Sequence, residues 1–196
     1  GTFAVFPADD GQIGTELWRT DGSSAGTALV RNIASDTSSS SRPGWLTGLG
    51  MDVVFTAYDG TNYGLWRSDG TAPGTVTVAQ VESYSGYYRS AAVQAGGLVF
   101  FPTGTTSSVQ LWRSDGTTPG TFSVGSVASV ECLTAAGNRV YFVNHSDTVG
   151  AEPWTSDGTV AGTHLVRDIY PGSSGSMNYC EPGYFHNGLF FFFAYD

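Results

Sequence analysis

The sequence predicts an all-β fold, a β-propeller built of four-stranded antiparallel blades. The first observation is a short stretch that occurs four times, as LWRTDGSSAGT, LWRSDGTAPGT, LWRSDGTTPGT and PWTSDGTVAGT. The second is its spacing, because the tryptophans Trp18, Trp66, Trp112 and Trp154 lie 48, 46 and 42 residues apart. A period in the forties, with short apolar runs between glycine-rich turns, indicates propeller blades rather than helical repeats.

The second repeat shows how one blade is composed. Residues 45–50, 53–58, 65–68 and 76–81 are short β-type runs separated by Gly, Asp and Pro, and no helical period is present. We expect these runs to be strands A to D, numbered from the inside of the blade outward by analogy with WD-type blades. The tryptophan of strand C is expected to pack between neighbouring blades.

An Asp-Gly turn joins strands C and D in every copy. Asp accepts backbone N–H groups just ahead of it and Gly permits positive φ, so the pair closes a tight turn. The alternative is a cation or sugar site that uses the carboxylate. We therefore predict a structural role for the four tryptophans and for Asp21, Asp69, Asp115 and Asp157.

The whole chain, 1–196, is predicted to be a single repeat array. Its repeats are 1–44, 45–91, 92–131 and 132–182, with a partial repeat at 183–196. The array starts and stops in a B strand, so either the ring closes with one B strand to spare or a second chain completes a larger ring. Because the last run, 189–194, is too apolar to stay uncovered, a homo-oligomer is predicted, with a dimer favoured.

The charge balance excludes two classes of partner. The net charge is −9, the pI is near 4.5 and all eight basic residues are arginine. Binding to nucleic acid or to an anionic membrane needs a basic surface, so neither is expected. No apolar run approaches the roughly 20 residues of a membrane-spanning helix, so no membrane insertion is expected either.

The two cysteines, Cys132 and Cys180, permit one disulfide. They stand near the start of equivalent strands in consecutive repeats, which allows a bridge. The alternative is two buried thiols. A bridge would favour an oxidising compartment.

The repeats also carry a family signature. Residues 16–22 read ELWRTDG, and the copies at 65–71 and 111–117 lack only the leading Glu. The fourth copy, EPWTSDGT at 152–159, has Pro in place of Leu, and LVRDIYPG follows it at 165–172. These residues resemble the bacterial ELWxxDGT repeat family. The resemblance implies a secreted or cell-surface propeller-like protein and supplies no common catalytic residues.

Loops that differ between repeats are where a ligand site is expected. In propeller layout the D–A and B–C connections share one face, and the D–A loops place aromatic rings beside Arg, Asn and Glu. Such loops suit sugars, because rings stack on C–H surfaces and polar groups bind hydroxyls. The alternative is that the rings fill the rim of the propeller. The predicted ligand-binding residues are Arg42, Tyr84, Tyr87, Tyr88, Arg89, Asn178, Tyr179 and Glu181.

The B–C loops are rich in oxygen ligands, which could hold calcium. The candidates are Asp59, Asp147 and Glu152. Their spacing does not match an EF-hand, and the third loop, 103–110, has no carboxylate. Solvated turns are therefore the simpler interpretation, and no cofactor is expected.

No catalytic motif is present: a nucleophile elbow, a phosphate loop and a zinc helix are all missing. We therefore expect no enzyme but an extracellular, lectin-like module that binds a glycan or a protein surface through its variable loops. The alternative is a structural or assembly module that mediates protein–protein contact or self-association. A third hypothesis is a sialidase-like or lyase-like propeller hydrolase.

Overall fold

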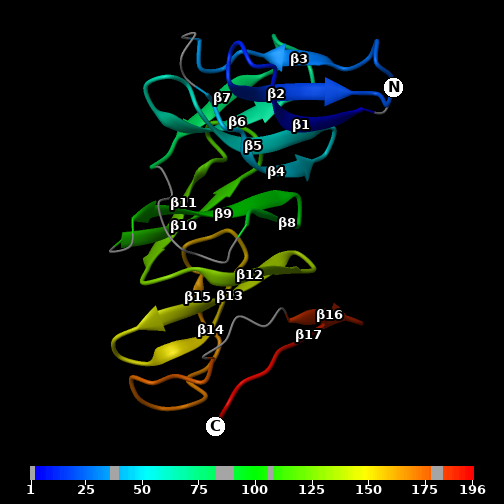
Figure 1. The fold of residues 1–196 in the computed structure, drawn as a ribbon. Coiled ribbons are helices and arrows are strands. Elements are labelled where there is room, and N and C mark those ends of the chain that lie inside the picture. Colours follow the sequence, from blue (N-terminus) through cyan, green and yellow to red (C-terminus); the bar gives the residue numbers. More distant parts are fainter. Residues whose placement is uncertain (1–2, 36–39, 83–90, 106–107, 178–182) are drawn as a thin grey trace. The chain divides into compact units, whose positions relative to one another are not determined.

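The structure is all-β, as the repeat predicts. The computed structural model describes residues 3–35, 40–82, 91–105, 108–177 and 183–196. These residues form 17 strands in five antiparallel sheets, three of them four-stranded, and no helix (Figure 1). Accordingly, no helix in the described part of the chain has the length and apolar character needed to cross a membrane. The chain divides into two compact units, residues 1–82 with 116–118 and residues 83–115 with 119–196.

The first unit holds two sheets. Within each sheet the strands follow their order in the sequence, so each strand pairs with the next one along the chain. The first sheet has three strands, β1 (Ala4–Asp9), β2 (Thr15–Thr20) and β3 (Ala28–Arg31). The second has four, β4 (Gly44–Leu49), β5 (Asp52–Tyr58), β6 (Tyr63–Ser68) and β7 (Val76–Gln80).

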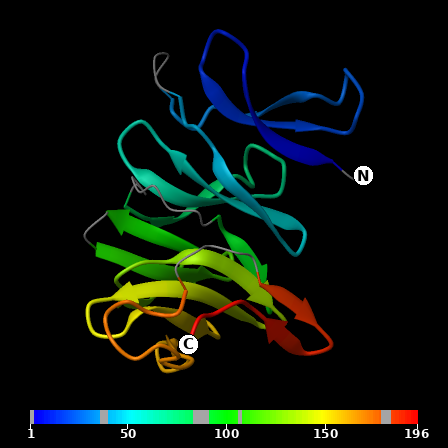
Figure 2. The same cartoon turned by 60° about the horizontal axis from the view of Figure 1, so that its bottom comes forward.

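The second unit holds two four-stranded sheets and a terminal hairpin, seen from a second direction in Figure 2. One sheet is formed by β8 (Val93–Ala95), β9 (Leu98–Thr105), β10 (Ser108–Ser114) and β11 (Phe122–Val127). The next is formed by β12 (Glu131–Ala136), β13 (Arg139–Ser146), β14 (Gly150–Ser156) and β15 (His164–Leu165). The hairpin is formed by β16 (Tyr184–His186) and β17 (Leu189–Phe191).

Each sheet coincides with one predicted repeat, apart from the boundary residues Gly44 and Glu131. The strands β1, β5, β9, β13 and β17 occupy the five predicted B positions. The first sheet has no A strand before β1, and the last has only its A and B strands within the described residues.

A phenylalanine of strand B lies opposite the repeat tryptophan of strand C in every complete pair. The pairs are Phe6 with Trp18, Phe55 with Trp66, Phe101 with Trp112 and Phe142 with Trp154. Two of these pairs, Phe55 with Trp66 and Phe142 with Trp154, lie in the apolar cores between neighbouring sheets of one unit, where burial of large rings contributes most.

The seams are alike in the two units. In the first unit Phe55 and Trp66 pack with Leu17 and Val30 of the preceding sheet. In the second unit Phe142 and Trp154 pack with Phe100 and Leu111 of the preceding sheet. Trp66 and Trp154 thus lie between neighbouring sheets, where the sequence predicts them.

The C–D turn is closed by its aspartate, by hydroxyl groups and by a glycine. In the second repeat, Asp69 Oδ1 accepts the N–H of Thr71 at 2.8 Å and the Thr71 hydroxyl at 2.7 Å. The hydroxyls of Ser68 and Thr75 bond to each other at 2.7 Å. A Cβ atom at Gly74 would overlap the Asp69 carboxylate, so only glycine fits that position. A Cβ atom at Gly26, Gly120 or Gly162 would likewise overlap the carboxylate of Asp21, Asp115 or Asp157, respectively.

These hydrogen bonds also lower the pKa of the turn carboxylates. The Thr71 hydroxyl, and after it the Thr71 N–H, lowers the pKa of Asp69 below its ordinary value of 3.8. Ser23 has the same effect on the pKa of Asp21, and Thr159 on that of Asp157. A donor that bonds the charged form stabilises it, so these turns are formed around ionised carboxylates.

Candidate functional site

A fully buried carboxylate holds a long connection at the edge of the first sheet. Glu16, on β2, accepts the N–H of Ile33 at 2.8 Å, the N–H of Ser41 at 3.0 Å and the Ser41 hydroxyl at 2.6 Å. Ile33 follows β3 and Ser41 precedes β4, so one side chain fixes both ends of the connection. A buried charge is stable only with such donors.

Glu152 repeats this arrangement in the second unit. From β14 its fully buried carboxylate accepts the N–H groups of Ile169 and Tyr170, both at 3.2 Å. It also accepts the N–H of Ser176 at 2.9 Å and the Ser176 hydroxyl at 2.6 Å. The leading Glu of the repeat is therefore a loop anchor. Glu152 was a candidate metal ligand from the sequence, but both of its carboxylate oxygens accept hydrogen bonds from its own chain.

The two other repeats lack this anchor. Gly64 and Gln110 stand at the equivalent position, two residues before the tryptophan, and Gln110 Oε1 instead accepts the indole N–H of Trp112 at 3.1 Å. The short connection from β11 to β12 is held by Asn144, whose Oδ1 accepts the N–H groups of Ala128 and Ser129 at 3.0 Å each.

The predicted ligand-binding residues are mostly beyond what the structure describes. Tyr84, Tyr87, Tyr88, Arg89, Asn178, Tyr179 and Glu181 lie outside the described residues. Arg42 is described: it is exposed, has a φ of +46° and donates its backbone N–H to the carbonyl of Thr15 at 3.1 Å. Its guanidinium is thus offered to solvent at the edge that Glu16 anchors.

The predicted calcium ligands do not converge. Asp59 Oδ1 accepts the N–H groups of Thr61 and Asn62 at 2.8 and 2.7 Å. Both bonds lower the pKa of Asp59, and the bond from Asn62 has the larger effect. Asp147 is exposed. Among the described residues, no three His, Cys, Asp or Glu side chains are grouped closely enough to hold a metal ion. Asp59 instead closes a turn, and Glu152 anchors a loop.

The imidazole rings of two described histidines lie beside a carboxylate and a backbone carbonyl. His145 Nε2 lies 3.5 Å from Glu131 Oε1, and both side chains are partly exposed. His164 Nδ1 lies 3.0 Å from the carbonyl of Leu165. An acid or base pairing of this kind needs a reacting group within hydrogen-bond reach to become catalytic.

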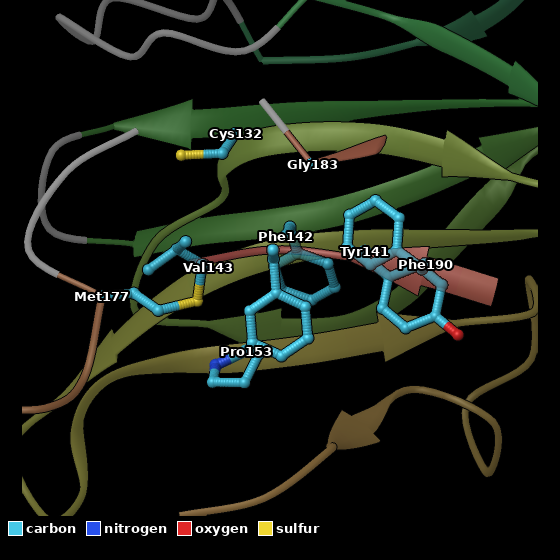
Figure 3. A pocket seen from close by; sticks show the side chains of 9 residues that line it. Cys132, Tyr141, Phe142, Val143, Pro153, Met177, Gly183 and Phe190 are labelled. Carbon is cyan, nitrogen blue, oxygen red and sulfur yellow. The ribbon is translucent and has the colours of Figure 1, made fainter. Parts of the chain in front are cut away.

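An apolar pocket lies in the second unit, between the last four-stranded sheet and the terminal segment (Figure 3). One wall is formed by Tyr141 and Val143 of β13 and Pro153 of β14, and the other by Phe190 and Phe192. The Tyr141 and Phe190 rings stack with centroids 4.4 Å apart. Met177 and Cys132 also line the pocket. Cys132 is disulfide-bonded, and Cys180, the other cysteine of the chain, lies outside the described residues. Sequence reasoning missed this pocket, although the Phe190–Phe193 run contains its key residues.

Comparison with known proteins adds a fold likeness. No protein-family model and no curated protein matches the chain. Two solved structures of puromycin hydrolase, one a mutant complexed with PGG, match it with TM-scores of 0.58 and 0.57 at 17% and 18% identity. A puromycin-hydrolyzing peptidase of Mycobacterium tuberculosis matches with a TM-score of 0.50 at 13% identity. The first two matches cover 91% of this chain and the third 86%, but each covers only 28% of the matched chain.

This likeness corrects two predictions from the sequence. The expected non-catalytic lectin-like module is wrong, and so is its structural or assembly alternative, because the matched structures are enzymes that hydrolyse puromycin. The expectation of no enzyme is corrected by the same finding. Sequence reasoning missed the relation, which is one of fold at only 17–18% identity.

Proposed function

We propose that the chain is a β-propeller domain of a hydrolase that acts on amide bonds of the aminoacyl or peptide type. The observation that carries the proposal is the match of 91% of this chain to puromycin hydrolase. The five sheets support the propeller, since each complete one is an A-to-D meander in which a strand-B phenylalanine pairs with the strand-C tryptophan.

The chain spans 28% of the length of the matched hydrolases. We therefore assign the bond-breaking step to the complete polypeptide that carries this domain, and to these residues a supporting role. The anchored connections fit that role, because Glu16 and Glu152 hold loop ends rigidly without exposing their own carboxylates. Loops fixed in this way can position a substrate or a neighbouring domain.

The test is hydrolysis of puromycin and of aminoacyl p-nitroanilides by the polypeptide that carries the domain. We expect release of the free amine, with kcat/KM lowered roughly tenfold or more when Glu152→Gln loosens the loop. The matched control is Val160→Thr, at a side chain that is 68% exposed in the following turn. A folded protein that leaves both substrate classes intact would refute the proposal.

Two further sequence expectations stand here as proposals. We place the chain with the bacterial ELWxxDGT repeat proteins; the anchoring role of Glu16 and Glu152 supports this by giving the leading Glu of the motif a physical purpose. We also propose a secreted or surface location. The Cys132 disulfide supports it, because disulfides persist in oxidising compartments.

A further inference from the structure

Two loops of the second sheet carry the same three residues, Asp-Gly-Thr. They are residues 59–61, between β5 and β6, and residues 69–71, between β6 and β7. Asp-Gly is the dipeptide most prone to aspartate isomerisation, in which the backbone nitrogen of the glycine attacks the aspartate side chain. Glycine has no Cβ atom to hinder this attack. Because the two loops share their three residues, a difference in their reactivity has to come from the fold.

In the C–D turn the N–H of the glycine is occupied. The Gly70 N–H donates to Ser68 Oγ at 3.0 Å, and Ser68 is buried. The Thr75 hydroxyl donates to the carbonyl of Thr71 at 2.7 Å, so its oxygen accepts the Ser68 hydroxyl, also at 2.7 Å. The Gly70 N–H therefore begins a chain of hydrogen bonds that ends on the backbone of the same turn.

Two other copies of the turn hold their glycine in the same way. The Gly22 N–H donates to Thr20 Oγ1 at 3.0 Å, and the Gly158 N–H donates to Ser156 Oγ at 3.1 Å. In both copies this hydroxyl bonds in turn to the threonine at the end of the turn, at 2.7 Å. A hydroxyl two residues before the glycine is thus a common part of these turns, supplied by Ser or by Thr.

The loop between β5 and β6 lacks such an acceptor. Tyr58 stands two residues before Gly60, and its hydroxyl donates to the Gly60 carbonyl at 2.8 Å. Among the described residues, none accepts a hydrogen bond from the Gly60 N–H. The next residues, Thr61 and Asn62, are exposed, so water reaches the loop. Hydrogen bonds lower the pKa of both Asp59 and Asp69, so the N–H of the glycine is the difference between the two loops.

We propose that Asp59 is a site of spontaneous isoaspartate formation, and that the hydroxyl two residues before the glycine suppresses the same reaction in the C–D turns. The Gly60 nitrogen bonds to Asp59 Cγ, and its proton leaves with the hydroxyl of the protonated carboxyl group as water. A succinimide ring results. Water then adds to the main-chain carbonyl carbon of Asp59 and breaks its bond to the Gly60 nitrogen. The chain now continues through the side-chain carboxyl group of Asp59, and its mass is unchanged.

The first test compares Asp59 with Asp69 in the unchanged protein. The folded chain is incubated in mildly acidic buffer and digested with an arginine-specific protease, which separates the two sites because Arg67 lies between them. Fragmentation mass spectrometry then distinguishes aspartyl from isoaspartyl peptides. We expect isoaspartate to form at Asp59 roughly fivefold faster or more, because at Asp69 a hydrogen bond has to break before the attack. Formation at Asp59 that is no faster than at Asp69 would overturn the proposal.

Denaturation in urea provides the control for this comparison. The hydrogen bonds of the turn are then lost, so the rates at Asp59 and Asp69 should converge. Rates that stay apart in urea would assign the difference to the residues that flank the two sites and not to the fold, which would also overturn the proposal.

The second test compares Ser68→Ala with Ser68→Thr. Ser68→Ala removes the acceptor of the Gly70 N–H, whereas Ser68→Thr keeps a hydroxyl, as Thr20 does in the first copy. The rate at Asp69 should rise roughly fivefold in Ser68→Ala and stay within about twofold in Ser68→Thr.

Asp21 and Asp157 report on the same sample, because their turns are unchanged. A rise confined to Asp69 supports the proposal, and a rate at Asp69 that changes no more than those at Asp21 and Asp157 counts against it. The comparison of Asp59 with Asp69 needs no variant, so it decides even where Ser68→Ala does not fold.

Discussion

The Ser176 hydroxyl donates to Glu152 Oε2 at 2.6 Å, deep in the second unit where both residues are fully buried. Ser41 and Glu16 form the same bond at 2.6 Å in the first unit. In each case the serine N–H donates to the other carboxylate oxygen. Since 24 or 25 residues separate the partners, each carboxylate is a tertiary clamp rather than a local turn.

Loss of this clamp should destabilise the second unit. Glu152→Ala leaves the N–H groups of Ile169, Tyr170 and Ser176 without an acceptor. Buried donors without partners cost about 1–3 kcal/mol each, so a total of about 3 kcal/mol is expected after partial rehydration. Urea unfolding measures it. Val160→Thr, at an exposed turn residue, should change the free energy of unfolding by no more than about 0.5 kcal/mol.

The turn glycine that contacts the aspartate should tolerate no side chain. Gly74→Ala places a Cβ atom against the Asp69 carboxylate, and we expect a loss of about 1–3 kcal/mol in the free energy of unfolding. Gly48→Ala is the control, because nothing lies within 4 Å of its Cβ position.

A double variant separates the steric cause from other causes. Asp69→Ala removes the carboxylate that Gly74→Ala would meet. The combined loss should therefore be smaller than the sum of the two single losses. Strict additivity would count against the contact as the reason for the glycine.

Much of the fold was predictable because it is local and periodic. The spacing of Trp18, Trp66, Trp112 and Trp154 marks the third strand of each repeat in the first four sheets, and each Asp-Gly turn is formed by bonds within eight residues. The number and order of the strands follow from these marks.

The site was not predictable in the same way. The clamp between Glu152 and Ser176 joins residues 24 positions apart. From the sequence alone, a loop carboxylate is explained as part of a solvated turn or, less simply, as a metal ligand. The pocket depends on Tyr141 and Pro153 of one sheet meeting Phe192, which follows β17. The hydrolase likeness is one of backbone shape, at only 17–18% identity.

The cysteine chemistry can be checked directly. Cys132 is disulfide-bonded and no described cysteine is free. Denatured, unreduced protein should therefore contain no thiol that reacts with a chromogenic disulfide reagent. After reduction, two thiols per chain should react, since the chain has two cysteines. Reduction should lower the free energy of unfolding by about 2–4 kcal/mol. Reactive thiols before reduction would contradict the bond.

The turn carboxylates should make stability depend on acid pH. The folded-state pKa values of Asp21, Asp69 and Asp157 are all lowered from 3.8, chiefly by a Ser or Thr hydroxyl bond. A carboxyl group whose pKa is lower in the folded than in the unfolded state stabilises the fold. This stabilisation is complete above the unfolded-state pKa and is lost as the pH falls through the folded-state pKa. The free energy of unfolding should thus decline as the pH drops below 3.8.

Urea midpoints measured from about pH 6 to about pH 2.5 test this dependence. Thr71→Val removes the largest cause of the Asp69 shift while it keeps the carboxylate. Below pH 3.8, the urea midpoint of Thr71→Val should depend less steeply on pH than that of the unchanged protein. The dependence should be weaker still in Asp69→Asn, because the amide cannot ionise. Profiles that run parallel through the acid range would show that the hydroxyl bond does not couple the ionisation of Asp69 to folding.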